Sequence, residues 1–169
     1  ARLTITHPSM VIFTGIKKYI MIGKLTDAEI EETLAKAFVG RIGCHADDLT
    51  YVIPVSYAYD GEYIYVRAGE GMKVNMMRKN PKVCFQVDQM ENMANWRSVI
   101  AWGVFEELSD PELRNHALEQ LASRIYPLIS SETVHFSREW PFKPADMASI
   151  KGVVFRILID QKTGRFENS

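Results

Sequence analysis

The chain has 169 residues and a mass of 19.3 kDa, a length that suits one compact domain with a full hydrophobic core. Apolar residues make up 47% of the sequence and charged residues 24%, which is ordinary for a globular protein and excludes wholesale disorder. A formal net charge of -1 provides no global positive field, so the composition argues against a protein that binds nucleic acid or an anionic membrane surface.

The two cysteines, Cys44 and Cys84, are too few for a disulfide framework. They fit a reducing compartment, and we therefore expect a cytoplasmic protein. The four histidines form no zinc-type spacing with these cysteines, so we expect no metal site. No apolar stretch approaches the roughly 20 residues that span a bilayer.

Residues 1–20 precede Met21 and show no clear hydrophobic period. Two interpretations stay open for this N-terminal extension. It is either a segment ahead of a natural start at Met21, or a strand or arm that packs on a partner subunit. No chemistry is assigned to it, and residues 21–169 are treated as a single domain.

The first regular element is a helix. The sequence T-D-A-E from Thr26 to Glu29 predicts a capping box, which satisfies free amides at a helix start. Apolar residues then recur at helical spacing, which predicts a helix over about 26–38 that ends near Gly40. The residues of its apolar face are Ile30, Leu34, Ala37 and Phe38.

Three strands are predicted next, with turn signals between them, and the second of the three is rich in β-branched and aromatic residues. They are 41–46, 51–59 and 62–68. The pair Asp60-Gly61 predicts a hairpin turn between the second and the third. Pro54 cannot donate to a sheet ladder, so it marks an edge strand, a bulge or a gap in pairing.

A second helix and two strands come next. Gly69 and Gly71 open a turn, and 72–79 is predicted to be a helix that Asn80-Pro81 stops. Strands are then predicted at 82–88 and 96–108, the second with a bend or bulge at Gly103.

The last third begins with a helix after Ser109 or Asp110, and an irregular stretch follows at 127–149. A final strand is predicted at 152–160, followed by a polar tail at 161–169. The apolar face of this helix is expected to comprise Leu113, Ala117, Leu118, Leu121 and Ile125.

About six strands joined mostly by turns, with about three helices, predict an α+β domain built around a small antiparallel barrel. A doubly wound parallel sheet is disfavoured, because it would need helical crossovers where this chain has turns.

The segment 69–73, GEGMK, is a candidate phosphate site. Glycines let the backbone approach a ligand, and the helix that follows offers free N–H groups and the positive end of its dipole. Lys73 adds a full charge, and Arg67, Arg78 and Lys79 lie close by in sequence. The alternative is a solvated connection with ordinary surface lysines.

The strands 51–59 and 96–102 alternate apolar and polar positions and carry Ser56, Arg97 and Ser98. An apolar wall with a few hydrogen-bonding groups suits a flat heterocycle, and the alternative is a barrel core with outward-facing polar residues. Tyrosines also gather on the strands of the 51–68 region, where cross-strand packing or an interface is favoured over stacking on bases. They are Tyr51, Tyr57, Tyr59, Tyr63 and Tyr65.

Three runs together resemble the pyridoxamine 5′-phosphate oxidase-like flavoproteins, and among them most of all the branch of the nitroimidazole-resistance proteins. The runs are GRIGCHADDLTYVIPVSYAYDGEYIYV, EGMKVNMMRKNPKVCFQVD and NWRSVIAWGVFEELSD. The resemblance covers roughly residues 25–160. It implies a split β-barrel that forms a homodimer and binds FMN noncovalently in a cleft between the subunits.

The resemblance also implies which residues contact the cofactor. The segment 53–56 would lie along the flavin ring and 65–68 beside the ribityl chain, with Lys73 on the phosphate and Met72 where relatives often carry Arg or Lys. The pair 97–98 would reach the flavin from the long strand. By residue, these positions are Ile53, Pro54, Val55, Ser56, Tyr65, Val66, Arg67, Ala68, Met72, Lys73, Arg97 and Ser98.

Two departures limit what the resemblance implies. Nitroimidazole-resistance relatives commonly have a histidine where this chain has Arg67, so a role for that imidazole is not expected here. Arg67 could instead bind the cofactor phosphate or an anionic substrate. The chain ends in TGRFENS and lacks the Arg-x-His of true pyridoxamine phosphate oxidases, so vitamin B6 oxidation is not expected.

The leading hypothesis is therefore an FMN-dependent oxidoreductase that takes electrons from NADH or NADPH, with substrate and catalytic residues unassigned. The second is a flavin-binding carrier, store or redox sensor without turnover. The third is an interaction module without a cofactor. A deazaflavin or haem in place of FMN is the fourth.

Overall fold

The computed structural model describes residues 21–124 and 149–169, which form three helices and one antiparallel sheet of eight strands. The sheet order is β3-β2-β6-β7-β8-β5-β4, and β1 pairs with β8 off this path. The strands are β1 (Met21–Lys24), β2 (Val39–Ala46), β3 (Leu49–Ser56), β4 (Ala58–Tyr59), β5 (Tyr63–Ala68), β6 (Lys82–Asn92), β7 (Asn95–Glu107) and β8 (Val153–Asn168), and the helices are α1 (Asp27–Lys36), α2 (Met72–Lys79) and α3 (Pro111–Ser123).

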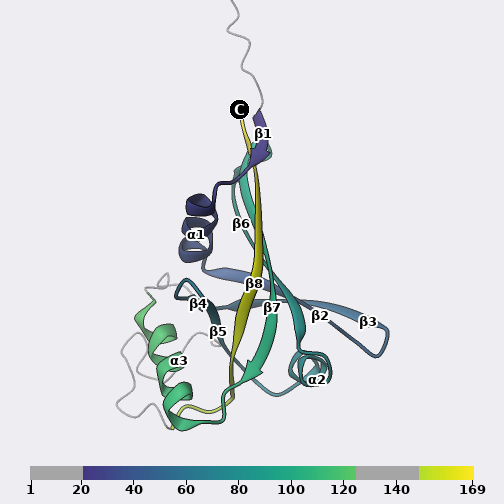
Figure 1. Cartoon of the computed structure of the whole chain (residues 1–169), viewed down its shortest axis with the longest axis vertical. Helices are drawn as coiled ribbons and strands as arrows, with labels where there is room; N and C mark the ends of the chain where they lie inside the picture. Colours follow the sequence, from purple (N-terminus) through teal and green to yellow (C-terminus); the bar gives the residue numbers. More distant parts are fainter. Residues whose placement is uncertain (1–20, 125–148) are drawn as a thin grey trace, which may run out of the picture.

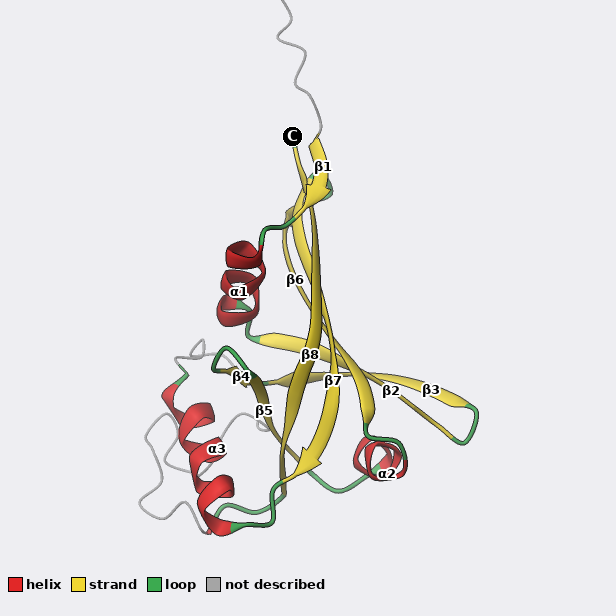
Figure 2. Ribbon diagram, in the orientation of Figure 1, coloured by secondary structure: helices red, strands yellow, loops and turns green. Residues whose placement is uncertain are grey.

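The long strands β6, β7 and β8 run side by side through the molecule, and the β2–β3 hairpin projects from them (Figure 1). Helices α1 and α3 lie on one side of these strands, and α2 lies below the β2–β3 hairpin (Figure 2). Although β3 and β5 stand near opposite ends of the sheet order, they are in contact. The sheet therefore curls toward closure without closing, which confirms the predicted split barrel.

The helix predictions are largely confirmed. Thr26 and Glu29 form the expected capping box, in which the Thr26 amide donates to the Glu29 carboxylate and the Glu29 amide donates to the Thr26 hydroxyl. Helix α1 ends two residues before the predicted boundary, and Phe38 lies outside it with 42% of its surface exposed. No helix in the described ranges is both long and apolar enough to cross a membrane.

The predicted polar tail at 161–169 is wrong, because β8 continues to Asn168 and pairs there with β7 and β1. The pairing works because every second position turns inward: a Cβ on Gly164 would lie 2.8 Å from Leu25 Cβ, and Phe166 packs against the core. Because polar residues occupy the alternate positions, the hydrophobic pattern of the sequence did not indicate a strand here. The unpredicted β1 and the division of the predicted strand 51–59 into two raise the strand count from the six expected to eight.

The segment predicted as one strand at 51–59 is divided at Tyr57 into β3 and β4. The Tyr57 side chain is fully buried, and its hydroxyl donates to the Leu34 carbonyl at 2.5 Å. Tyr57 also packs edge-to-face against Phe85, with ring centroids 4.8 Å apart. The aromatic side chain thus turns into the core, and β4 continues in a new direction.

Helix α3 begins where expected, with the Asp110 carboxylate accepting from the Glu112 and Leu113 amides. Of its predicted apolar face, Ala117, Leu118 and Leu121 are buried. Leu113 is 39% exposed, so the prediction that it packs inward is wrong: it lies in the first turn, beyond the edge of the smaller core cluster. Ile125 and almost all of 127–149 lie outside the described residues.

Both predicted breaks in the strands are confirmed. The pairing of β7 with β8 shifts register between Trp102 and Gly103, and a Cβ on Gly103 would stand 2.1 Å from the Leu158 carbonyl oxygen. Glycine is required there because any side chain would overlap the neighbouring backbone. Pro54 lies on β3, an edge of the sheet, where its missing N–H breaks no second ladder.

Alternation gives the sheet a buried and an open face. Along β7 the side chains of Val99, Ala101 and Phe105 are buried in the main core. Ile100 and Trp102 alternate with them and are 37% and 42% exposed. The open face therefore leaves large apolar side chains exposed.

Helix α1 is tied to the sheet by a three-residue polar contact. The Tyr59 hydroxyl donates to the Glu31 carboxylate at 2.6 Å, and the Lys162 ammonium contacts both groups. Burial, together with the hydrogen bond to Glu31, raises the pKa of Tyr59 to about 12 from its ordinary 10.0. Because the folded chain holds the phenol proton more tightly, this contact is strongest while Tyr59 is protonated.

This contact predicts a loss of stability at alkaline pH. Below pH 10.0 the phenol is protonated in both states, and between 10.0 and about 12 the unfolded chain loses its proton first. The free energy of unfolding should therefore fall across this window, and it should fall less steeply in Tyr59→Phe. Urea unfolding followed at several pH values measures both slopes.

Tyr51→Phe is the control, because the Tyr51 hydroxyl makes no hydrogen bond to another described residue. Equal slopes for the parent chain and Tyr59→Phe would contradict the assignment.

Candidate functional site

The start of α2 differs from the starts of the other two helices. Thr26 caps α1 and Asp110 caps α3 through their side chains, whereas Gly71 caps α2 and offers no side chain. The Asn75 amide makes the first helical hydrogen bond, to the Gly71 carbonyl. The backbone N–H groups in the first turn of α2 therefore remain available to donate to a ligand.

Gly71 holds this start open through its backbone. Its φ of 155° and ψ of -168° lie in a region that residues with a Cβ rarely adopt. No heavy atom comes within 4 Å of a Cβ built on Gly69 or Gly71. Glycine is thus needed at 71 for conformation, and the space beside the loop is free to admit a ligand.

Lys73 is the cation that remains available at this helix start. The first turn of α2 contains no acidic residue, and Lys73 makes no ion pair with any residue in the described ranges. Its side chain is half-buried, so a charge-assisted contact there is less screened than on the open surface. An uncapped helix start with one free ammonium group is suited to bind a phosphate.

Arg78 and Lys79 do not join Lys73, although their sequence positions made them candidates. Arg78 contacts Glu107 at 2.7 Å and Glu70 at 2.9 Å, and these hydrogen bonds raise its pKa. Lys79 pairs with Asp47 on the β2–β3 turn. Both cations are neutralised by carboxylates, so the positive charge is confined to the helix start.

Arg67 points from β5 toward the segment before β8. Its guanidinium donates to the Lys151 carbonyl at 3.1 Å. Burial, and to a lesser degree the nearby charge of Arg114, lowers the pKa of Arg67. Arg114 donates to the adjacent Ile150 carbonyl at 2.6 Å, so two arginines converge on this segment.

Four predicted contacts on β3 are divided between the two faces of the sheet. Ile53 packs against the main core and Val55 is buried in it. Pro54 is exposed and Ser56 is half-buried, and both alternate with the inward-facing pair. Only Pro54 and Ser56 can therefore present side chains to a ligand on the open face.

The predicted contacts on β5 can serve mainly through their backbone. Tyr65 and Val66 are buried, and the Tyr65 hydroxyl donates to Asp60 at 2.7 Å. Ala68 ends the strand, paired with Val153, and leads into the Gly69–Gly71 loop. Met72 is 49% exposed at the first position of α2.

Ser98 belongs to a polar cluster on the open face, the rest of which the sequence did not single out. The Gln86 amide donates to Asp88 at 2.9 Å and to Ser98 at 3.3 Å, and Arg41 pairs with Asp88 at 2.7 Å. Arg41 is directly opposite both Pro54 and Gln86 in the register. The spacing of Gln86 and Asp88 in a strand was a signal that these residues share one face.

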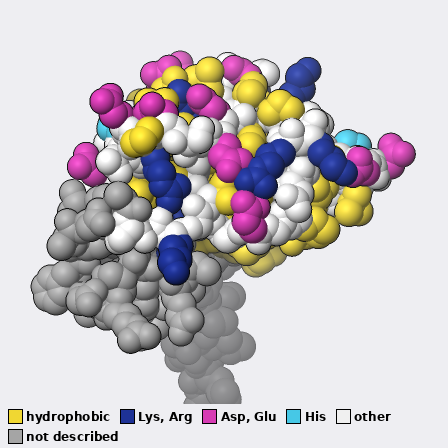
Figure 3. Space-filling view, turned by 90° about the horizontal axis from the view of Figure 1, so that it is seen from below, with side chains coloured by type: hydrophobic (Ala, Val, Ile, Leu, Met, Phe, Trp, Pro, Cys, Tyr) yellow, Lys and Arg dark blue, Asp and Glu magenta, His cyan; other side chains and the backbone are white. Residues whose placement is uncertain are grey.

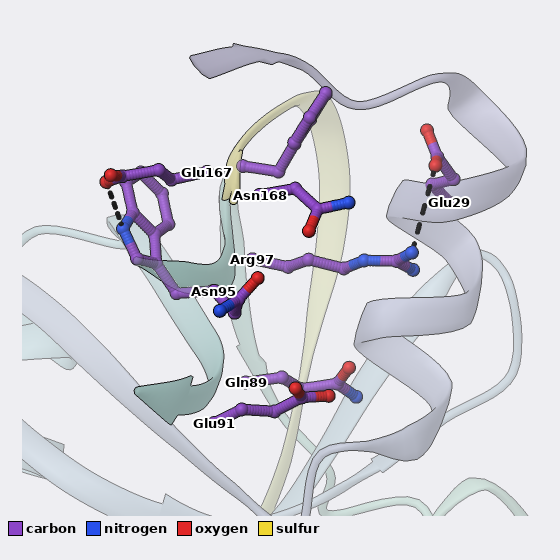
Figure 4. Close-up of a pocket in the computed structure, with 9 residues that line it drawn as sticks. Glu29, Gln89, Glu91, Asn95, Arg97, Glu167 and Asn168 are labelled. Atoms are coloured by element: carbon purple, nitrogen blue, oxygen red, sulfur yellow. Dashed lines mark hydrogen bonds and ion pairs between the residues drawn. The ribbon is translucent and has the colours of Figure 1, made fainter. Parts of the chain in front are cut away.

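Arg97 faces away from Ser98 and lies in a separate cavity of about 450 Å³. Figure 4 shows its side chain extending toward Glu29 of α1. Trp96 also lines the cavity, and its indole N–H donates to the Glu167 carboxylate at 2.9 Å. Arg97 lies 4.0 Å from Glu29 and 3.5 Å from Glu32. Within one chain, Arg97 and Ser98 therefore cannot contact the same face of one ligand.

The chain belongs to the pyridoxamine 5′-phosphate oxidase family, because the model of that family matches residues 26–166. A FAD-binding protein from Mesorhizobium loti is 30% identical, with a TM-score of 0.66 over 89% of this chain and 100% of that one. The predicted family is confirmed.

Two further solved structures share the fold. A candidate 5-nitroimidazole antibiotic resistance protein from Bacteroides thetaiotaomicron has a TM-score of 0.65 at 20% identity, over 89% of this chain and 90% of that one. The FAD-binding protein from Mycobacterium smegmatis has a TM-score of 0.62 at 21% identity, over 87% and 100%.

A curated relative, an uncharacterized protein from Rhizobium meliloti, is 34% identical over 80 residues. The match covers 47% of this chain and 53% of the relative, so the chain spans about half the length of that protein.

The geometry at Gly71 gives a direct test of the helix start. Gly71→Ala should lower the free energy of unfolding by roughly 1–3 kcal/mol, because alanine must adopt a strained backbone conformation. Chemical denaturation measures the loss. Gly69→Ala is the matched control, since its Cβ would also enter open space and its φ is not in the strained range. A Gly71→Ala chain as stable as Gly69→Ala would contradict this account.

Proposed function

We propose that this chain is a flavoprotein that binds FMN noncovalently through the start of α2, with the phosphate on the open amides and on Lys73. The observation that carries the proposal is the combination at this helix start of a glycine cap, no acidic residue in the first turn and one unpaired ammonium. A phosphomonoester close to two negative charges complements these donors.

The open sheet face supplies what the flavin ring would need. Pro54 and Ile100 offer apolar surface, and Ser56 and Ser98 offer hydroxyl groups at its edge. Flat heterocycles bind to mostly apolar walls with a few hydrogen-bonding groups. The relationship to the FAD-binding protein of Mesorhizobium loti supports the same class of ligand.

The proposed activity is that of an oxidoreductase that takes electrons from NADH or NADPH. A bound flavin would supply the redox chemistry. The chain's own residues would hold the phosphate and cover one face of the ring. A chain that binds FMN but oxidises no reduced nicotinamide would instead be a carrier or redox sensor.

We also propose that the chain forms a homodimer through the open sheet face. Val52 is 60% exposed, and the register places it in line with Gly43, Cys84 and Trp102 across four strands. A second apolar pair, Val104 and Leu158, lies beside this row. A contiguous exposed apolar surface of this kind is typical of a protein interface.

The phosphate contact predicts the effect of one substitution. Lys73→Ala removes a charge-assisted hydrogen bond, typically about 1.5–3 kcal/mol, so the dissociation constant for FMN should rise roughly 10- to 150-fold. Quenching of flavin fluorescence on titration with the protein measures it.

Lys24→Ala is the control, because Lys24 is an exposed lysine on β1 at the other end of the sheet. The phosphate assignment fails if Lys73→Ala and Lys24→Ala bind FMN with the same affinity.

The interface has its own test. Trp102→Glu places a charge in the middle of the apolar row and should convert a dimer into a monomer, as measured by sedimentation velocity. Leu113→Glu on α3 is the control, because Leu113 is similarly exposed, at 39% against 42%, but lies away from this face. A parent chain that sediments as a monomer, or a Trp102→Glu chain that remains dimeric, would refute the proposed interface.

A further inference from the structure

A groove of about 440 Å³ lies between α2 and the β2–β3 hairpin. The helix contributes Met72, Asn75, Met76 and Lys79, and the hairpin contributes Ala46, Asp47 and Leu49. Ala46 and Met76 also belong to the main core, whereas Leu49, Met72 and Asn75 are exposed. At the end of the molecule formed by this hairpin, charged and hydrophobic side chains stand next to one another (Figure 3).

The two walls of the groove are held at a fixed distance. Lys79 of α2 pairs with Asp47 at the tip of the hairpin, and the Asn80 side chain donates to the His45 carbonyl at 2.8 Å. Asp47 and Asp48 both have positive φ, of 52° and 59°, which closes the hairpin in a tight turn. The groove is therefore a built feature that two contacts and a turn keep open.

Its lining suits a flat aromatic base. Ala46 and Met76 form a floor and are each only 6% exposed, whereas Leu49 and Met72 form sides that are 50% and 49% exposed. Methionine thioethers pack favourably on aromatic rings. Asn75 is exposed and adds an amide, which can donate to and accept from one edge of adenine at the same time.

The groove begins where the flavin phosphate is proposed to bind. Met72 is the first residue of α2, and the lining positions 72, 75, 76 and 79 follow one side of the helix. At 1.5 Å per residue, this side runs about 10 Å from the helix start. A group attached to a phosphate at the helix start can therefore lie along the groove.

We propose that this groove is an adenosine subsite, so that FAD, with its FMN half held as proposed above, binds more tightly than FMN alone. This inference rests on the proposed function, because the flavin phosphate at the start of α2 is what directs the second half of the dinucleotide into the groove. Leu49, Met72 and Met76 would enclose the adenine ring, and the Asn75 amide would bind its polar edge. A protein segment docking in the same groove is the competing occupant, and it predicts no preference for FAD.

The test compares FMN and FAD on the same flavin-free full-length protein by isothermal titration calorimetry. FAD should bind more tightly than FMN by about tenfold or more, the equivalent of one or two satisfied hydrogen bonds with the accompanying apolar burial. Asn75→Ala should weaken FAD roughly 2- to 10-fold and leave the FMN affinity unchanged. Leu49→Asp, at a half-exposed position that tolerates a polar residue, should weaken FAD in the same selective way.

The FMN affinity of each variant serves as its internal control, because it should equal that of the parent chain. Asn168→Ala, at an exposed site at the far end of β8, should change neither the FAD nor the FMN affinity. Equal binding of the two flavins, or variants that weaken FMN as much as FAD, would overturn the adenosine subsite while leaving the phosphate site standing. If neither flavin binds, the proposed function itself fails, and the subsite fails with it.

Discussion

The pairing of β8 with its neighbours is the contact on which the rest of the structure depends. Its sixteen residues pair with β7 along most of their length, with β5 at one end and with β1 at the other. The shift in register at Gly103 is tolerated because glycine leaves room for the Leu158 carbonyl. Since each position of β8 fixes which neighbouring side chains face inward, this strand decides the composition of both faces of the sheet.

The proposed site follows from how charges are distributed over this framework. In a chain of net charge -1, local positive potential arises only where acidic partners are absent. Arg78 and Lys79 are neutralised by Glu70, Glu107 and Asp47, and these pairs hold the last turn of α2 in place. Lys73 is left beside an uncapped helix start, so the same ion pairs that position the helix also isolate its binding end.

The sequence was sufficient where local chemistry decides the structure. The capping box at Thr26, the hairpin at Asp60-Gly61, the bulge at Gly103 and the helix at 72–79 are all local signals, and each is confirmed. It was insufficient where long-range pairing decides, as in the polar segment 161–168, which is a strand only because β1 and β7 pair with it.

The candidate site shows the same division. The Gly69–Gly71 loop and Lys73 could be singled out from spacing alone. The ion pairs that Arg78 and Lys79 make could not, because their partners Glu107 and Asp47 are distant in sequence. The strand period also determines that Arg97 and Ser98 face opposite sides, although family resemblance alone would place them together. The cluster of Arg41, Gln86 and Asp88 becomes evident only once the register joins β2 to β6.

The central claim is that this chain holds a flavin. The most direct measurement is a visible absorption spectrum of the freshly purified full-length protein, with mass spectrometry of any ligand released on denaturation. The account predicts a flavin spectrum, either as purified or after addition of FMN or FAD, and recovery of an intact flavin nucleotide. A colourless protein that takes up neither nucleotide would contradict it and leave a cofactor-free interaction module as the remaining interpretation.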